Sequence, residues 1–413
     1  MDKFISYISR GFGFVYAFIK RMTKKKGLIK NNQILIVATG HIGNAIIDAP
    51  AIEDLSKFYK SIGKRVCLLC SDAMNSAFDL VIDLSEVTFL GNNYHYGDRG
   101  TYFSVVRQTL NNLKGHEFEK IIVTLTNCDP LAHYIVACVP TNESWGIFDD
   151  VKQEYGYIRH YFERYYTNKV MVPVDLHETQ RLKLMLEQLG CHGHRTRISY
   201  IPKQMESLKR APYITVAVDS MSTSRRWVSE KFVALIHKLL ESYSYDVYLT
   251  GNHVTEHETQ VYEAAFDKQL RVKNYIGKTS FKEWIELLRH SRFHIGVDSG
   301  SIHVAASVGT QSFCLTGVWD AKRVMPYQID EKDDSTMEPI CIYRSDVDIN
   351  EMDCYACKVY RTRIGRGNKE CYSLCMNGRP CLCLGKIEVE DVERSIASID
   401  AVLRKQKEED MYA

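Results

Sequence analysis

The sequence lacks a long apolar run and carries almost no net charge. No uninterrupted apolar stretch approaches the roughly 20 residues that cross a bilayer. The formal net charge of +2 gives no overall attraction to nucleic acid, so we expect no nucleic-acid partner. The N-terminus also lacks the basic region, apolar core and small-residue cleavage site of a signal peptide. We therefore expect a cytoplasmic protein.

Cysteine, in contrast, is plentiful. In a cytoplasmic protein most of the 13 cysteines should be reduced thiols or metal ligands rather than disulfides. Seven of them lie between Cys341 and Cys383, and Cys354 and Cys357 are spaced as zinc ligands often are. The later members at irregular spacing are Cys371, Cys375, Cys381 and Cys383. A structural zinc site, packed thiols and a disulfide remain the alternatives for this segment.

The chain of 413 residues is too long for one ordinary core, which predicts two domains. Short apolar runs rich in β-branched residues alternate with amphipathic segments, a pattern typical of α/β folds. The expected strands are 33–38, 65–71, 120–126, 213–220, 245–251, 293–300 and 312–317. Both halves therefore read as doubly wound, Rossmann-like parallel sheets, which would bind ligands at the carboxyl ends of their strands. We expect the two to face each other across a cleft.

Changes in composition set the expected domain borders. The predicted parts are a basic amphipathic segment (1–30), a first Rossmann-like domain (31–190), a linker (191–211), a second Rossmann-like domain (212–340), a cysteine-rich segment (341–385) and a C-terminal helix (386–413).

The first 30 residues predict a helix with two interpretations. Apolar residues recur at helical spacing, namely Phe4, Ile5, Ile8, Phe12, Val15 and Ile19. A basic cluster of Lys20, Arg21 and Lys24 to Lys26 follows. This pattern suits a helix that lies in the membrane surface beside anionic lipid. It equally suits a helix that packs on its own protein and leaves its basic end in solvent.

A glycine turn follows the first expected strand, in "ATGHIGN" (38–44). Gly40 and Gly43 permit a tight turn and a close approach of ligand to backbone N–H groups. The turn matches neither GxGxxG nor a P-loop. It is therefore either one side of a ligand site or simply a structural turn.

Two polar stretches in the second half follow expected strands. Arg225 and Arg226 precede Trp227, and an arginine at a strand end can grip a phosphate with two hydrogen bonds. The alternative is a solvated basic loop anchored by the tryptophan. The other stretch, "GVDSGSIHVAASVG" (296–309), leads from a strand into a helix. Free N–H groups at such a helix start form a natural anion site, to which Ser299, Ser301 and His303 could add donors.

These pieces together resemble glycosyltransferase family 9, the bacterial heptosyltransferases that build lipopolysaccharide core. The stretches "ILIVATGHIGNAIIDAPAIEDL", "SMSTSRRWVSEKFVALI", "LTGNHVTEHE", "GVDSGSIHVAASVGTQSFCLTG" and "CLCLGKIEVEDV" match the family in order, over roughly residues 33–400. The resemblance implies a GT-B fold. It places the acceptor on the first domain and a nucleotide-diphosphate sugar on the second.

The resemblance also implies roles for individual residues. Arg225 stands where the family usually has a lysine, and Glu256, with Glu258 as the alternative, would hold the nucleotide ribose. The residues that would meet the donor's phosphates are Asp298, Ser299, Gly300, Ser301 and His303. The implied chemistry inverts the sugar without a metal or other cofactor, because positive side chains and helix dipoles would stabilise the leaving diphosphate.

One position departs from the family. The family's first turn carries an acid that acts as general base on the acceptor hydroxyl, but this chain has Asn44 there. The base could instead be Asp48, one helical turn on, or His41, whose ordinary pKa suits a base at neutral pH. The remaining alternative is a member of the family without transferase activity.

Two functions from different classes follow. The first is an inverting, metal-independent transferase that moves heptose or a related sugar, perhaps ADP-linked, to a lipid-linked saccharide, with peripheral contact to the inner membrane face. The second is an inactive protein that binds a nucleotide sugar or a saccharide. A nucleotide-sugar epimerase fits less well, because "GHIGN" lacks that class's glycine spacing and no Tyr-x-x-x-Lys helix occurs where that class would need it.

Overall fold

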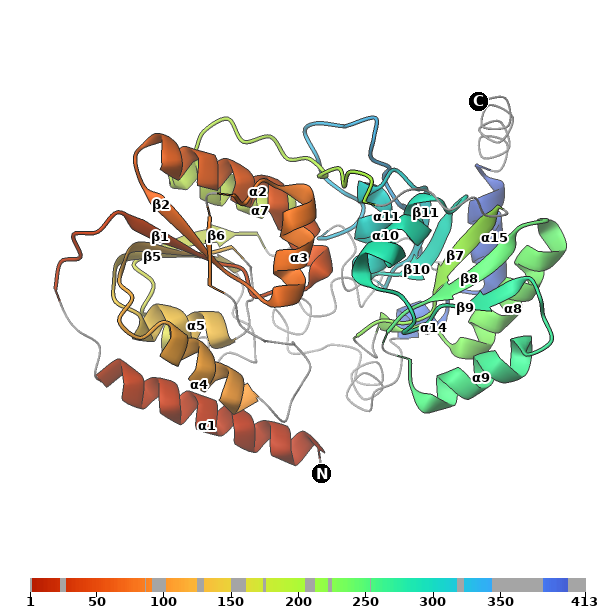
Figure 1. Ribbon diagram of the computed structural model, residues 1–413, viewed down its shortest axis with the longest axis horizontal. Coiled ribbons are helices and arrows are strands. Elements are labelled where there is room, and N and C mark those ends of the chain that lie inside the picture. Colours follow the sequence, from red (N-terminus) through yellow and green to blue (C-terminus); the bar gives the residue numbers. More distant parts are fainter. Residues whose placement is uncertain are drawn as a thin grey trace. The chain divides into compact units, whose positions relative to one another are not determined.

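The computed structural model divides the chain into two compact units. Unit 1 comprises Met1–Ser199 with Gln328–Glu331, and unit 2 comprises Tyr200–Tyr327 with Lys332–Ala413. The structure describes residues 2–22, 27–85, 87–90, 102–124, 130–149, 161–173, 176–204, 212–221, 225–252, 254–317, 323–343 and 382–399. Each unit is built around one parallel sheet (Figure 1).

The sheet of unit 1 has the strand order β3-β2-β1-β4-β5-β6, and all its pairs are parallel. Its strands are β1 (Gln33–Val37), β2 (Arg65–Leu69), β3 (Thr88–Phe89), β4 (Phe118–Val123), β5 (Thr141–Asp149) and β6 (Asn168–Val172). The central strands are apolar on both faces because helices cover both sides. This order is that of a Rossmann fold, in which the chain reverses direction between β1 and β4.

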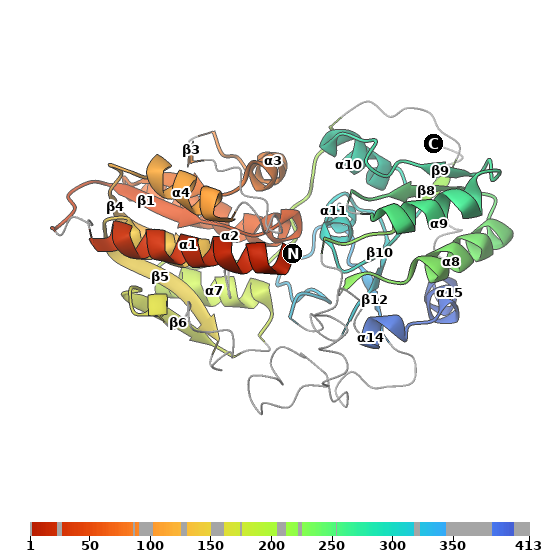
Figure 2. The same cartoon turned by 90° about the horizontal axis from the view of Figure 1, so that it is seen from below.

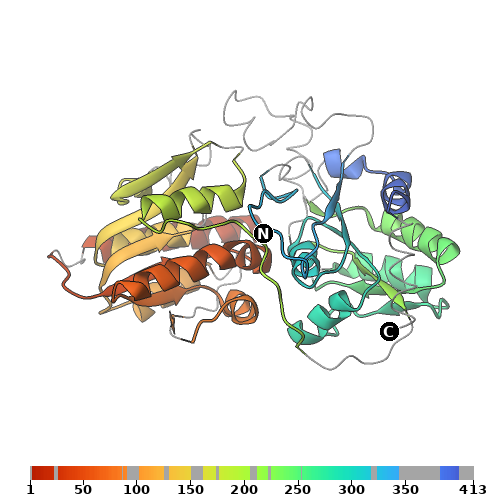
Figure 3. The ribbon, with the colours of Figure 1, turned by 90° about the horizontal axis from the view of Figure 1, so that it is seen from above.

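Helices cover both faces of this sheet (Figures 1 and 3). On one face lie α2 (Ile42–Ser61), α3 (Asp72–Val81) and α7 (Glu178–Gln188). On the other lie α4 (Tyr102–Asn112) and α5 (Pro130–Cys138), with α1 (Asp2–Met22) packed outside them. The predicted N-terminal helix is thus present and packs on its own unit.

Unit 2 repeats the same plan. Its sheet has the order β12-β11-β10-β7-β8-β9, again all parallel. The strands are β7 (Tyr213–Ala217), β8 (Asp246–Thr250), β9 (Val272–Asn274), β10 (His294–Val297), β11 (Ser312–Leu315) and β12 (Ile340–Ile342). In chain order this is the Rossmann arrangement once more, and the reversal falls between β7 and β10.

The helices of unit 2 form two layers around the sheet (Figure 1). On one face lie α8 (Ser229–Ser242), α9 (Glu256–Phe266) and α15 (Val389–Ala397), and on the other α10 (Phe281–Arg289) and α11 (Gly300–Ser307). A short helix, α14 (Leu382–Gly385), leads into α15. Trp227 is fully buried here and its indole N–H donates to the Ile387 carbonyl at 3.0 Å, which fastens the C-terminal elements to the core.

The predicted fold class is confirmed: the chain consists of two doubly wound α/β units with helices on both faces. All seven expected strands are present, at β1, β2, β4, β7, β8, β10 and β11. Within the expected C-terminal helix (386–413), the structure describes α15 over Val389–Ala397. The sequence reading had not identified β3, β5, β6, β9 and β12, most of which are short or lie toward the sheet edges.

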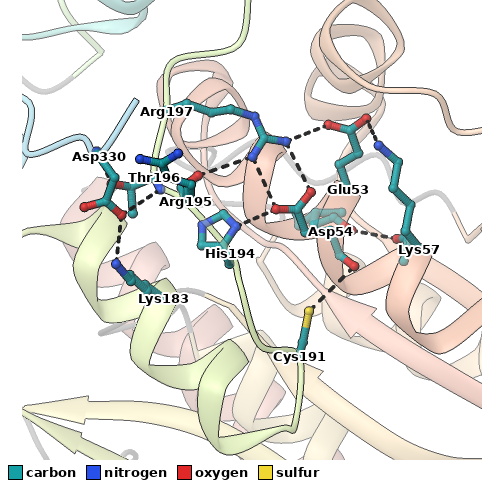
Figure 4. Close-up of polar contacts among 12 residues, drawn as sticks. Glu53, Asp54, Lys57, Lys183, Cys191, His194, Arg195, Thr196, Arg197 and Asp330 are labelled. Atoms are coloured by element: carbon teal, nitrogen blue, oxygen red, sulfur yellow. Dashed lines mark hydrogen bonds and ion pairs between the residues drawn. The ribbon is translucent and has the colours of Figure 1, made fainter. Parts of the chain in front are cut away.

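The first part of the predicted linker is fixed to unit 1 by a polar cluster (Figure 4). His194 Nδ1 lies 2.7 Å from Asp54 Oδ2, and Arg197 contacts both Asp54 and Glu53. Burial opposes ionisation of Asp54, but the hydrogen bonds from His194 and Arg197 outweigh it and lower its pKa to about 2. On the same surface Asp330 accepts from Lys183 at 2.8 Å.

Two further expectations concern cysteines and membranes. Cys67, Cys70, Cys191, Cys314 and Cys341 are free thiols, and Cys383 is buried. Cys354, Cys357, Cys371, Cys375 and Cys381 lie outside the described residues, so the zinc hypothesis stays a prediction. Among the helices in the described part of the chain, none is both long and apolar enough to cross a bilayer.

Candidate functional site

The most polar strand end of unit 2 lies at its topological switch point. Doubly wound sheets bind ligands beside the carboxyl ends of the two strands where the order reverses. In unit 2 these strands are β7 and β10, which pair directly. The chain after β7 leads to Arg225, and the chain after β10 is the Asp298–Ser301 turn. Both stretches singled out from the sequence therefore meet at one edge.

The Asp298–Ser301 turn is shaped as a helix start. Ser299 is the N-cap of α11 with an extended backbone, and Gly300 is the first helical residue. The hydroxyls of Ser299 and Ser301 lie 3.0 Å apart. Because the first-turn N–H groups of a helix have no partner within it, this end presents backbone donors beside two hydroxyls. Such an arrangement favours an anion.

The Asp298 carboxylate faces two nitrogen-bearing side chains, the Arg225 guanidinium and the His303 imidazole. Its carboxylate is 4% exposed, and within the described residues Oδ2 has no hydrogen-bond partner. Arg225 Nη1 lies 3.7 Å from that Oδ2, and His303 Nε2 lies 4.0 Å from Oδ1. Both distances exceed a hydrogen bond, so the attraction is purely electrostatic. The Arg225 side chain is 38% exposed and therefore accessible to a ligand.

Tyr327 orients His303 from the other side. The buried Tyr327 hydroxyl lies 2.6 Å from His303 Nδ1. Burial raises the pKa of this phenol well above its ordinary value, so it stays neutral. When the phenol donates to Nδ1, the N–H of the imidazole is on Nε2, which faces Asp298. Tyr327 is a site residue that the sequence reading missed, since no local pattern links it to a histidine 24 positions earlier.

The two adjacent arginines have different surroundings. Arg226 is buried, and it donates to the Ser220 carbonyl at 2.8 Å and to Glu258 Oε2 at 2.9 Å. Glu258 also accepts from the N–H and hydroxyl of Thr255 at the start of α9. Glu258 is thus held by the fold. The other candidate ribose ligand, Glu256, lies exposed in the first turn of α9.

A close backbone approach joins the ends of β7 and β8. Gly251 has φ +149°, and a Cβ there would lie 2.6 Å from Asp219 Oδ1. Asp219 Oδ2 accepts from the Asn252 N–H at 2.8 Å. Only glycine fits at position 251 because the carboxylate occupies the space of any side chain. Asp219 is a second polar residue at this edge that the sequence reading did not single out.

In the glycine turn of unit 1, the Asn44 side chain is hydrogen-bonded to the backbone of the same turn. Asn44 Oδ1 accepts from the backbone N–H of His41, the N-cap of α2, at 3.1 Å. A Cβ on Gly40 would lie 2.7 Å from Asn44 Cβ, so the asparagine side chain fills the turn that glycine leaves open. The amide oxygen of Asn44 is therefore engaged in holding the start of α2, and His41 is half-buried beside it.

One turn further along α2, Asp48 lies in an acidic environment. It is buried, and Thr124, just after β4, donates to its Oδ2 at 3.5 Å. Burial, and then the negative charge of Glu178 at the start of α7, raise the pKa of Asp48 well above its ordinary value. A carboxyl with a raised pKa suits a general base at neutral pH. Asp48 and Thr124 flank the unit 1 switch point between β1 and β4, and the sequence reading missed Thr124 and Glu178.

The structure thus assembles the predicted site residues in two separate groups. Unit 2 brings together Arg225, Asp298, Ser299, Gly300, Ser301 and His303, and it places Glu256 at the end of the neighbouring strand β8. Unit 1 brings together His41 and Asn44, with Asp48 one helical turn on. Within the described residues, no group of three or more histidine, cysteine or acidic side chains could hold a metal ion.

Comparisons with known proteins show what this chain is similar to. The model of glycosyltransferase family 9 (heptosyltransferase) matches residues 152–336. Lipopolysaccharide heptosyltransferase 3 of Escherichia coli K12 is 24% identical over 293 residues, which cover 67% of this chain and 80% of that protein.

Solved structures share the fold. A family 9 glycosyltransferase from Veillonella parvula superposes with a TM-score of 0.59 at 15% identity, covering 92% of this chain and 99% of that one. Escherichia coli ADP-heptose lipopolysaccharide heptosyltransferase II gives 0.59 at 12% identity, covering 91% and 99%. The two doubly wound units are therefore those of a GT-B fold.

The fold is that of the GT-B class, and the part of the chain that the family model matches includes the Asp298–Ser301 turn. More closely, the family model over residues 152–336 and the curated relative make the chain similar to the heptosyltransferases of glycosyltransferase family 9. The resemblance predicted from the sequence is confirmed.

Proposed function

We propose that the protein transfers heptose or a related sugar from a nucleotide-diphosphate donor, ADP-linked, to a lipid-linked lipopolysaccharide acceptor. The observation that carries this proposal is the unit 2 cluster, in which Arg225 and the α11 N-terminus converge with Asp298 at the switch point. The Escherichia coli relative acts in lipopolysaccharide synthesis by its name, and the structural neighbour is named for ADP-heptose.

The donor diphosphate would lie on the start of α11. Backbone N–H groups, the hydroxyls of Ser299 and Ser301 and the Arg225 guanidinium supply donors for its oxygens. Asp298 is itself negative, so its part is to hold Arg225 and His303 in place rather than to bind phosphate. The exposed Glu256 would accept from the ribose hydroxyls.

Transfer would invert the anomeric carbon and need no metal ion. As the acceptor oxygen forms a bond to the anomeric carbon, the bond between that carbon and the phosphate oxygen breaks. The electron pair of the broken bond leaves with the nucleoside diphosphate. Arg225 and the helix dipole would stabilise this developing charge. Chelation of divalent ions should then leave the transfer rate unchanged.

Asp48 is the proposed general base. It takes the proton of the acceptor hydroxyl, and its raised pKa makes it a stronger base than an ordinary aspartate. His41 is the alternative, because it lies at the turn beside Asn44. A protein that binds sugars without transfer is the second candidate function, favoured by the replacement of the family's acid with a structurally engaged Asn44.

The acceptor would meet unit 1 in the cytoplasm, at the inner face of the membrane. There a lipid-linked saccharide would present its terminal hydroxyl for transfer.

A thermal-shift screen of ADP-, UDP- and GDP-sugars tests the proposal. A donor at about 100 times its Kd should stabilise the protein by about 2.7 kcal/mol, which is roughly 5–10 °C in Tm for a unit of this size. We expect an ADP-sugar to give the largest shift. The absence of a shift with every nucleotide sugar would contradict donor binding, and a shift without transfer to acceptor would favour the non-catalytic alternative.

A further inference from the structure

Helix α1 has two apolar faces, and only one of them packs on unit 1. Gly13 and Ala17 are buried, and the Ala17 carbonyl accepts from Cys138 Sγ on α5 at 3.2 Å. Phe14 packs edge-on against Tyr161 and Phe162, with ring centroids 5.5 and 5.7 Å apart. These contacts hold the helix on α4 and α5, on the outside of the unit (Figures 1 and 2).

The opposite face of α1 carries an exposed apolar stripe. Phe12, Val15, Ile19 and Met22 are 59%, 51%, 56% and 75% exposed. Their spacing of three and four residues places them along one side of the helix. Scattered exposed apolar residues are ordinary, but a continuous stripe marks a surface that contacts something apolar.

Basic residues lie near the C-terminal end of α1. Lys20 and Arg21 lie over the rings of Tyr16 and Tyr165, at 5.4 and 4.2 Å from the ring centroids, and Lys30 is exposed a few residues on. The sequence from Asp2 to Lys30 holds eight basic residues and one acidic residue, in a chain whose net charge is only +2. Positive charge is thus concentrated at the N-terminus.

We propose that α1 docks in the plane of an anionic phospholipid bilayer, with Phe12, Val15, Ile19 and Met22 as its lipid face. Apolar side chains would enter the boundary between headgroups and acyl chains while Lys20 and Lys30 contact lipid phosphates. No described helix can cross the bilayer, so this helix lies on the membrane rather than spanning it. A second copy of the chain is disfavoured as the occupant because two strongly basic segments would repel each other.

The proposed docking surface and the proposed donor site have no residue in common. The stripe lies on α1, whereas the donor cluster lies in unit 2. The interpretation that α1 packs on its own protein is confirmed, and the membrane interpretation is proposed for the exposed face.

Vesicle co-sedimentation of the full chain tests the inference. The wild type should bind vesicles of phosphatidylcholine with about 30% phosphatidylglycerol. Pure phosphatidylcholine, or ~0.5 M salt, should weaken binding because both reduce the electrostatic attraction. The double variant Val15→Ser with Ile19→Ser should lose roughly tenfold or more in partitioning, since it removes apolar area from the lipid face.

The matched control is Leu270→Ser with Met171→Ser. These two residues are 90% and 54% exposed; Leu270 belongs to unit 2 and Met171 to β6, so neither is on α1 and the control should bind vesicles as the wild type does. Equal Tm values and equal thermal shifts with donor would show that all variants fold.

Three outcomes would overturn the docking surface. They are no binding by the wild type, equal binding by both double variants, or a concentration-dependent dimer that Val15→Ser with Ile19→Ser abolishes. Vesicle binding without any donor shift would contradict the proposed function alone, and a donor shift without vesicle binding would contradict the docking surface alone.

Discussion

The strand-to-helix turns at the two switch points differ in how their polar side chains are paired. In unit 2 the Asp298–Ser301 turn leaves a buried carboxylate oxygen without a hydrogen bond from the described residues, beside an accessible arginine. In unit 1 the Gly40–Asn44 turn satisfies itself, because the Asn44 amide accepts from the His41 N–H and fills the space beside Gly40.

This difference indicates where each unit can act on a ligand. In unit 2 the buried Asp298 carboxylate holds the accessible Arg225 guanidinium electrostatically beside the first turn of α11, where both can meet an anion. A turn that pairs its own groups offers little to a ligand. In unit 1 the chemically unusual group lies one turn later, at Asp48. The two units thus have different proposed roles. Unit 2 binds the donor at its turn, whereas in unit 1 Asp48 of α2 accepts the proton of the acceptor hydroxyl.

The largest expected effect belongs to Asp48→Asn. If Asp48 is the base, the variant should lose about 10²–10⁴ in kcat, the usual worth of general base catalysis, while donor binding is unchanged. Steady-state transfer and thermal shift with donor measure the two quantities.

Two companion variants decide between the bases. His41→Ala should abolish transfer only if His41 is the base, and unchanged turnover excludes it. Asn44→Asp restores the family's acid at the turn. A transfer rate that rises only in Asn44→Asp would place the catalytic base at residue 44. It would contradict the proposal that the base lies at Asp48 rather than in the Gly40–Asn44 turn.

Arg225→Ala tests the other turn. Loss of this charge should lower kcat/KM by roughly 10²–10³, because the cation stabilises the leaving diphosphate. Arg225→Lys, which introduces the residue usual in the family, should recover part of the loss. Arg195→Ala removes an arginine that pairs with Glu331 on the surface and serves as the control. Equal losses in Arg225→Ala and Arg195→Ala would contradict the assignment.

Asp54→Asn tests whether Asp54 stabilises the fold, in contrast to Asp48, the proposed base on the same helix. Because folding lowers the pKa of Asp54 to about 2, below its unfolded value of about 3.9, the carboxylate stabilises the fold above pH ~4. That contribution is lost as pH falls toward 2. The variant should unfold about 1–3 kcal/mol more easily in urea at pH 7 and differ little from the wild type near pH 2.

The neighbouring pair supplies a control for that measurement. Glu53 is about as exposed as Asp54, but it contacts the exposed Lys57 and shares Arg197, whereas Asp54 also contacts the buried His194, so Glu53→Gln should cost less than about 1 kcal/mol. A larger cost for Glu53→Gln than for Asp54→Asn would mean that the buried His194 contact does not control the strength of this cluster.

Asp48→Asn should also change stability, in the opposite direction to Asp54→Asn. Folding raises the pKa of Asp48, so ionisation works against the fold increasingly as pH rises above ~4. The neutral asparagine removes this opposition, and Tm should rise at pH 7–8 with the difference shrinking toward pH 4. A lower Tm at neutral pH would argue that Asp48 is a structural acid.

The smallest effect is expected for Tyr327→Phe. Loss of the 2.6 Å contact leaves His303 Nδ1 without this partner and loosens the ring that faces Asp298. As a positioning residue, Tyr327 should contribute roughly 3–10-fold to kcat/KM, since one neutral hydrogen bond is worth about 1 kcal/mol. A shift in the pH profile of the transfer rate would separate this role from simple packing.

Much of the fold could be predicted from local pattern. The apolar runs "QILIVA" and "FHIGV" predict buried strands because both faces of a parallel sheet are covered. The strand "TNESWGIFD" of β5 was missed, since polar residues interrupt its apolar run. For α1 the helical period was clear, but the buried face carries Gly13 and Ala17 and the more apolar face is exposed.

The candidate site was predicted only in part, for a similar reason. Asp298, Ser299, Gly300, Ser301 and His303 are close in sequence and could be found as one motif. Tyr327 and Glu178 act through contacts between distant parts of the chain, which one sequence does not reveal. The difference between Arg225 and Arg226 also arose from tertiary partners, because Ser220 and Glu258 bury only the second.

Calorimetric titration with ADP tests the central claim, that the Asp298–Ser301 turn and Arg225 hold the donor diphosphate. The account predicts at least about tenfold weaker ADP binding by Arg225→Ala than by the wild type, with adenosine affinity the same in both proteins. Equal ADP affinity in the two proteins would contradict it.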